Sequence, residues 1–205
     1  MGGRHVRRAA RSRLQGKRRP GLRLGAITMS VGPEEIERFK DRQAIYDCLM
    51  RYCRGVDRQD AELLKTAYHQ GATDDHGIFN GDAWEFAEFI GPFDASIGVR
   101  QQTHRVDHAL IEFTGPDSAV VESYNLTFID AETEDGMAAA MVGGRYLDRF
   151  ERRNGAWKIA HRLYVMDWNR NEPSTVDWEG SFFKDLARGR MDDQDESFAY
   201  VPCLR

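Results

Sequence analysis

The change from helical to alternating hydropathy at Gly98 constrains the fold more than any other feature of the sequence. Before Gly98, apolar residues recur at three- and four-residue steps, as on one face of an amphipathic helix. This spacing predicts helices over about 33–56, 61–68 and 84–97, and a short strand over about 74–79. After Gly98, alternating residues predict four consecutive strands over about 103–113, 119–129, 138–151 and 156–168.

Short turn sequences separate the predicted strands. Gly115-Pro116-Asp117 follows the first strand, residues 130–136 follow the second, and Asn154-Gly155 follows the third. The last pair is a strong signal for a two-residue hairpin. Helices followed by an antiparallel meander predict an α+β fold, in which the helices cover one face of a strongly curved, mostly antiparallel sheet.

The composition is that of one globular domain with extensions. The chain has 205 residues, of which 41% are hydrophobic and 30% are charged. The best apolar run, 137–142, is far shorter than the roughly 18 residues of a membrane helix. The three cysteines lack a CxxC pair, and are too few for a disulfide framework. We therefore expect a cytoplasmic protein that does not enter the membrane.

Basic residues are concentrated at the N-terminus. Residues 1–28 contain nine of the 29 lysines and arginines and none of the 33 acidic residues. Such an arm is typical of a nucleic-acid-binding tail, a transit peptide, or codons translated upstream of the true start. We favour the last, because Ser12 is the only serine in the arm and Met29 directly precedes the domain. We expect that domain over 29–170 and an irregular tail over 171–205; the acidic body argues against nucleic acid as a partner.

Five motifs follow one another between about residues 34 and 168. They are Asp41–Asp47, Arg51–Asp57, Thr103-His104, Gly144–Arg152 and Gly155–Arg162. Together they resemble the SnoaL-like family of the nuclear transport factor 2-like (NTF2-like) superfamily, including its bile-acid dehydratase-like, scytalone dehydratase-like and dehydrochlorinase-like members. The resemblance implies a cone-shaped fold around an apolar pocket. It also implies a homo-oligomer, either a dimer or a trimer, and no cofactor.

His104 and Asp57 are the first candidate catalytic residues. An imidazole can take or return a proton near neutral pH, and a carboxylate on its Nδ1–H fixes the tautomer. In members that the sequence resembles, a histidine on this strand pairs with an aspartate at the end of the first helix, and His104 and Asp57 match those positions. The alternatives are that Asp57 caps a helix and that His104 is a core histidine with satisfied hydrogen bonds.

Tyr52 is a third candidate, five residues before Asp57. Five residues rotate side chains about 140° apart on a straight helix, so the two converge only if the helix bends or ends near Gly55. A phenol in the pocket can hydrogen-bond a substrate oxygen or donate a proton. The alternative is an aromatic side chain packed in the core with its hydroxyl at the rim.

Arg162 is the fourth candidate, and two arguments about it disagree. The resemblance implies that it points into the cavity and stabilises a leaving group or oxyanion. Strand alternation instead places it on the face opposite the more apolar set, Trp157, Ile159, His161, Leu163 and Val165.

His108 shares a strand face with His104, so we expect it to contact substrate deeper in the same pocket. A metal site is disfavoured, because two histidines four residues apart on a strand lie about 13 Å apart. No HExxH, GxGxxG, Walker A or GxSxG motif occurs in the sequence. We expect neither a metal nor a cofactor.

These residues predict a cofactor-independent lyase or isomerase of the dehydratase type. Its substrate would be a hydrophobic polycyclic or aromatic small molecule. Two alternatives stay open: a binding module without catalysis, and the small subunit of an aromatic-ring dioxygenase.

Overall fold

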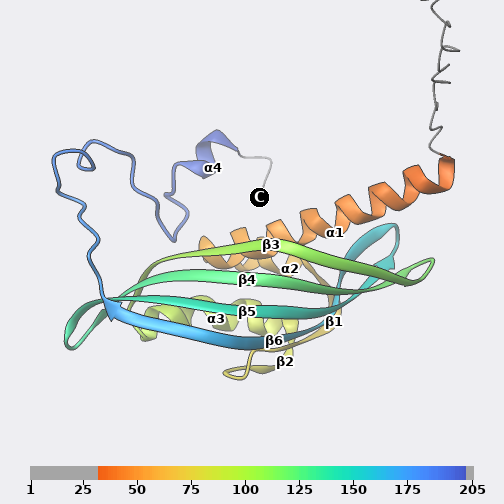
Figure 1. Ribbon diagram of the computed structural model, residues 1–205, viewed down its shortest axis with the longest axis horizontal. Helices are drawn as coiled ribbons and strands as arrows, with labels where there is room; N and C mark the ends of the chain where they lie inside the picture. Colours follow the sequence, from red (N-terminus) through yellow and green to blue (C-terminus); the bar gives the residue numbers. More distant parts are fainter. Residues whose placement is uncertain (1–31, 202–205) are drawn as a thin grey trace, which may run out of the picture. The chain divides into compact units, whose positions relative to one another are not determined.

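The computed structural model describes residues 32–201, so the predicted basic arm over 1–28 lies outside the described residues. Within them the predicted α+β fold is confirmed (Figure 1). The elements are α1 (Pro33–Asp57), α2 (Ala61–Thr66), β1 (Tyr68–Asp75), β2 (Asn80–Asp82), α3 (Ala83–Ser96), β3 (Val99–Gly115), β4 (Ser118–Thr133), β5 (Gly136–Arg153), β6 (Ala156–Pro173) and α4 (Ser197–Tyr200).

The six strands form one sheet in the order β2-β1-β6-β5-β4-β3. Strands β3 to β6 are the predicted antiparallel meander, and β1 pairs with β6 in parallel. That pairing places Asp74 beside Arg162. Figure 1 shows α1 running along β3, with α2 and α3 behind the strands. The sheet is therefore mixed but mostly antiparallel, and its helical side is where a buried site can form.

Local sequence signals set the ends of these elements. Asp60 caps α2 through a 2.9 Å bond from the Leu63 backbone N–H to its carboxylate. Asn154 and Gly155 adopt positive φ values of 52° and 79°, as the predicted hairpin turn requires. Gly55 is needed for close packing, because a Cβ atom there would lie 2.8 Å from the Leu64 backbone. These contacts bring α2 against the end of α1 and fix the position of Asp57.

The core lies between the helices and the inner face of the sheet. The later part of the predicted apolar stripe of α1 is buried there and includes Ile45, Leu49 and Val56, whereas Ile36 and Phe39 near its start are exposed. Phe150 on β5 and Ile159 on β6 pack in the same cluster. Burial of this stripe is the main force that holds α1 to the sheet.

A β-bulge in β3 reverses its alternation and corrects the expectation for His108. The register with β4 shifts between Val106 and Ala109, which inserts one extra residue. His104 lines the inner cavity before the bulge, and Ile111 is buried after it. His108 is exposed, and its ring lies 6.4 Å from that of Tyr124. The sequence predicted that His108 lines the same cavity as His104, but it does not.

A second bulge lies in β6. Arg149 pairs with His161 and Phe150 with Ile159, which leaves Ala160 without a partner. Before Ala160 the buried positions are odd-numbered, such as Ile159. After Ala160 the buried position is even-numbered, Arg162. The prediction from alternation that Arg162 points away from the core is therefore wrong, because its side chain is fully buried.

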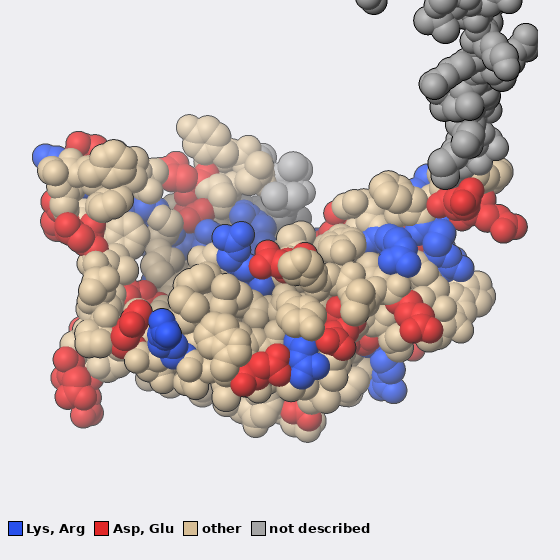
Figure 2. Space-filling view, in the orientation of Figure 1, with Lys and Arg blue, Asp and Glu red and all other residues tan. Residues whose placement is uncertain are grey.

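The outer face of the sheet carries exposed apolar side chains, among them Leu110 at 70% exposure, Tyr124 and Trp168. Acidic and basic side chains are interspersed on the face shown in Figure 2. No helix within residues 32–201 is long and apolar enough to cross a membrane. The expected homo-oligomer stays a prediction.

Candidate active site

A cavity of about 340 Å³ lies between the helices and the inner face of the sheet. Its apolar lining includes Val56, Phe86, Ile90, Phe93 and Val142. Its polar lining includes Tyr52, His76, His104, Asn125, Thr127 and Tyr164. A mostly apolar pocket with a few convergent polar groups is the usual form of a small-molecule site.

His104 on β3 and Asp57 at the end of α1 meet at this cavity. The distance from His104 Nδ1 to Asp57 Oδ1 is 2.7 Å, and both side chains are 12% exposed. The backbone N–H of His104 also donates to both carboxylate oxygens at 3.0 Å. With its Nδ1 proton held by Asp57, His104 has Nε2 free to accept a proton.

One of the two alternatives for this pair is excluded, because the cap of α2 is Asp60 and not Asp57. His104 lines the cavity, with its side chain 12% exposed. The geometry is that of an imidazole oriented by a carboxylate and facing an apolar space.

Tyr52 lines the cavity but does not converge with Asp57. Helix α1 continues through Gly55 to Asp57, so the two side chains take different directions and partners. The Tyr52 hydroxyl lies 3.2 Å from His76 Nε2. Burial raises the pKa of Tyr52 well above its ordinary value, which keeps it a neutral phenol that can donate a hydrogen bond.

His76, which sequence reasoning had not selected as catalytic, forms a second His–Asp pair with Asp74. His76 Nδ1 hydrogen-bonds to one Asp74 oxygen, and the Tyr68 hydroxyl donates to the other. The His76 ring is stacked between Phe86 and Tyr164, at centroid distances of 4.7 and 5.2 Å. The available signal was the Asp-x-His spacing, because residues two apart on a strand share a face.

Arg162 points inward, but it does not line the cavity. It is fully buried, and its guanidinium donates two 2.8 Å bonds to Asp148. The rings of Tyr52 and Tyr146 lie over it, at 4.0 and 3.8 Å. Burial lowers the pKa of Arg162, but the Asp148 carboxylate raises it more, so the guanidinium stays charged. The expectation that Arg162 contacts a leaving group is therefore wrong. Its guanidinium packs against the Tyr52 ring instead.

Two further polar groups of the cavity were also missed by sequence reasoning. Asn125 Nδ2 donates to Thr127 Oγ1 at 3.1 Å, while Asn125 Oδ1 is buried with no hydrogen-bond partner among the described residues. Gln102 Nε2 donates to Asp94 at 2.8 Å, and burial raises the pKa of Asp94. The sequence alone does not identify these side chains, because they come from separate elements that meet only at the cavity.

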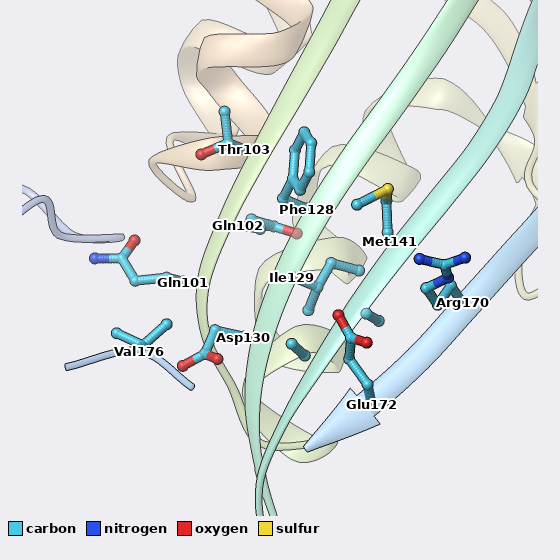
Figure 3. A pocket seen from close by; sticks show the side chains of 12 residues that line it. Gln101, Gln102, Thr103, Phe128, Ile129, Asp130, Met141, Arg170, Glu172 and Val176 are labelled. Carbon is cyan, nitrogen blue, oxygen red and sulfur yellow. The ribbon is translucent and has the colours of Figure 1, made fainter. Parts of the chain in front are cut away.

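A second hollow, of about 250 Å³, is lined mostly by strand residues and contains none of the predicted catalytic side chains. Figure 3 shows it, with Thr103 on β3, Phe128 on β4, Met141 on β5 and Arg170 on β6. The candidate active site is therefore the inner cavity. Within residues 32–201, no cluster of three His, Cys, Asp or Glu side chains is placed to hold a metal.

The model of the SnoaL-like domain family matches residues 37–163, which is more than half of the chain. The chain belongs to the SnoaL-like domain family. The matched region of this SnoaL-like protein includes both His–Asp pairs. No curated protein sequence matches the chain.

Solved structures show the same fold at low sequence identity. A type 2 hexachlorocyclohexane dehydrochlorinase (LinA) is 19% identical with a TM-score of 0.60, over 72% of this chain and 98% of its own. A proposed scytalone dehydratase from Novosphingobium aromaticivorans is 19% identical with a TM-score of 0.55, over 68% and 91%. An NTF2-like protein with a cystatin-like fold, from the same organism, is 17% identical with a TM-score of 0.52, over 65% and 86%. The SnoaL-like protein thus has an NTF2-like fold.

Proposed function

We propose that this SnoaL-like protein is a cofactor-independent lyase or isomerase that removes a proton next to a carbonyl group. The observation that carries the proposal is the 2.7 Å bond between His104 Nδ1 and Asp57 on the wall of an apolar cavity. The names of two fold neighbours, a dehydrochlorinase and a proposed dehydratase, support the elimination class.

In this reaction His104 Nε2 takes the proton from carbon, and Asp57 stabilises the imidazolium that forms. General base catalysis of this kind contributes about 10²–10⁴-fold to the rate. Thr127 Oγ1, which accepts a bond from Asn125, can turn its own proton toward the substrate carbonyl. Fixed donors in a site that excludes water stabilise an enolate more than they would in solution.

The walls of the cavity favour a ring-containing, mostly apolar substrate. Phe86, Phe93 and Tyr164 offer aromatic faces, and Ile90 and Val142 offer aliphatic contacts. The proposed substrate class is therefore a polycyclic or aromatic carbonyl compound. Charged metabolites such as nucleotides are disfavoured, because Arg162, which lies against the Tyr52 ring, is fully buried, is paired with Asp148 and does not line the cavity.

The test is hydrogen–deuterium exchange at the carbon next to a ketone. A panel of bicyclic ketones that includes 1-tetralone is incubated with the protein in D₂O and followed by proton NMR. We expect catalysed exchange, and a loss of at least about 100-fold in His104→Gln. His108→Gln is the matched control, because His108 lies on the same strand but is exposed.

Two results would contradict the proposal. Exchange that survives in His104→Gln would remove His104 as the base. Ketones that bind without exchange, with affinity retained in a His104→Ala and Asp57→Ala double variant, would instead favour a binding module.

A further inference from the structure

The outer face of the sheet, which points away from the helices, carries a broad apolar patch. Figure 1 views the sheet from this side, with α2 and α3 behind the strands. The pleat turns every second residue of β3 to β6 outward, and on β4 the outward residues are even-numbered. Exposed apolar patches of this kind mark interaction surfaces. Six large apolar side chains on this face are at least 36% exposed: Leu110, Val120, Tyr124, Phe128, Leu163 and Trp168.

This outer face is large enough for a stable contact with another protein. It spans about 34 Å along β4, from Val120 to Asp130, and its four strands β3 to β6 are about 19 Å wide. A pair of such faces buries about 650 Å² on each side, or about 1,300 Å² in total, which is within the range of specific interfaces. The apolar residues Leu110, Leu147 and Leu163 also line a hollow of about 750 Å³ on this face, which a partner can fill.

Charges without an ion pair lie at both ends of the face. At one end, the exposed side chain of Arg149 makes no hydrogen bond or ion pair with the described residues. At the other end, Ala139 of β5 pairs with Asp130 of β4 on one side and with Glu172 of β6 on the other. These two carboxylates and Arg170 line the hollow of about 250 Å³ (Figure 3), and Asp130 Oδ1 is buried with no hydrogen-bond partner in residues 32–201. A buried carboxylate oxygen is stabilised by a donor, so this end suits a positively charged side chain.

A two-fold axis brings the two ends of the face together. When two identical sheets pack face to face about an axis that crosses the strands at Gly144, each β5 residue faces the partner residue equally far on the other side of Gly144. Arg149 and Ala139 lie five residues from Gly144 in opposite directions, so each Arg149 faces the hollow of the other copy. Leu147 and Met141 lie three residues from Gly144 and face one another in the same way. One symmetry operation therefore joins apolar groups to apolar groups and the cation to the carboxylates.

We propose that the protein forms a symmetric dimer through the outer faces of two sheets, with Arg149 of each copy held between Asp130 and Glu172 of the other. The partner is a second copy, because the cation and the carboxylates that match by symmetry lie on the same face of one chain. Arg145, near the axis, already pairs with Asp167 at 2.9 Å and adds no unpaired cation to the contact. The helices and the inner cavity stay outside the interface, so the inference does not depend on the reaction proposed there.

The mass of the full chain in solution tests the apolar part of the interface. We expect sedimentation equilibrium at micromolar concentration to give twice the 23.5 kDa of one chain. Leu110→Glu places a charge in the apolar patch and is expected to give a monomer. Phe39→Glu is the matched control, because Phe39 lies on α1 and is 71% exposed, against 70% for Leu110, so neither change disturbs the core. A monomer or a trimer of the unaltered protein, or a dimer that persists in Leu110→Glu, would overturn the inference.

Charge reversal tests how the two faces are aligned. Arg149→Glu and Glu172→Arg each place like charges opposite one another twice in a dimer, so we expect each to raise the dissociation constant at least about 10-fold. In an equal mixture of the two variants, every substituted side chain faces a native side chain of opposite charge, and we expect association to return to the level of the unaltered protein. Arg51→Glu, on α1, is the control for the change in net charge. A mixture that stays monomeric, or an equal loss in Arg51→Glu, would overturn the placement of Arg149.

Discussion

Removal of the Asp148 carboxylate is expected to destabilise the protein strongly. Asp148→Asn keeps the shape of the side chain but leaves the Arg162 guanidinium, which is 0% exposed, without its counter-ion. Two charge-assisted bonds of 2.8 Å are weakened or lost. Breaking a buried ion pair by changing one partner costs about 3–5 kcal/mol, which is a large fraction of the roughly 5–15 kcal/mol that holds a domain folded.

The double variant Asp148→Leu with Arg162→Leu provides the decisive comparison. Both charges are then absent, so no uncompensated ion stays buried, and we expect a smaller loss than in Asp148→Asn. Urea unfolding followed by circular dichroism gives the free energy of unfolding and the slope for each protein. A loss below about 1 kcal/mol in Asp148→Asn, or a double variant less stable than the single one, would refute this reasoning.

Two further predictions concern stability. Burial raises the pKa of Asp94, so the folded state binds its proton more tightly than the unfolded state and loses stability as the pH rises through the raised pKa. Asp94→Asn, which keeps an oxygen for Gln102, should therefore raise Tm at neutral pH, with the gain vanishing as the pH falls to about 4; an equal gain at both pH values would contradict this. Gly55→Ala should lower the free energy of unfolding by about 1–3 kcal/mol, because the new Cβ would lie 2.8 Å from the Leu64 backbone; an unchanged urea midpoint would show that α2 can shift.

The long elements could be predicted from the sequence because the spacing of their apolar residues repeats regularly over many positions. The stripe of α1 and the alternation of β3 to β6 extend over many residues, and Asn154-Gly155 marks one turn by its backbone requirement. The inward direction of side chains could not be followed along whole strands. One extra residue near His108 and another at Ala160 each reverse the faces, and neither bulge has a distinctive residue type.

The candidate site was predictable only in part, for a related reason. Asp57 and His104 were selected from motif positions in the family resemblance, because the residues alone favoured a helix cap and a core histidine. Asp74 in β1 and His76 just beyond it are two residues apart, but their importance depends on the parallel pairing of β1 with β6 and on the cavity between distant elements. Contacts of this kind come from the packing of elements far apart in sequence, which hydropathy does not encode.

The measurement that tests the central claim most directly is ketone exchange by Asp57→Asn. The amide cannot hold the His104 Nδ1 proton as a carboxylate does, nor stabilise the imidazolium. We predict that exchange of 1-tetralone in D₂O falls at least about 100-fold, while 1-tetralone still binds and the protein stays folded. Exchange at the rate of the unaltered protein would contradict the account, because His104 would then act without the carboxylate that orients it.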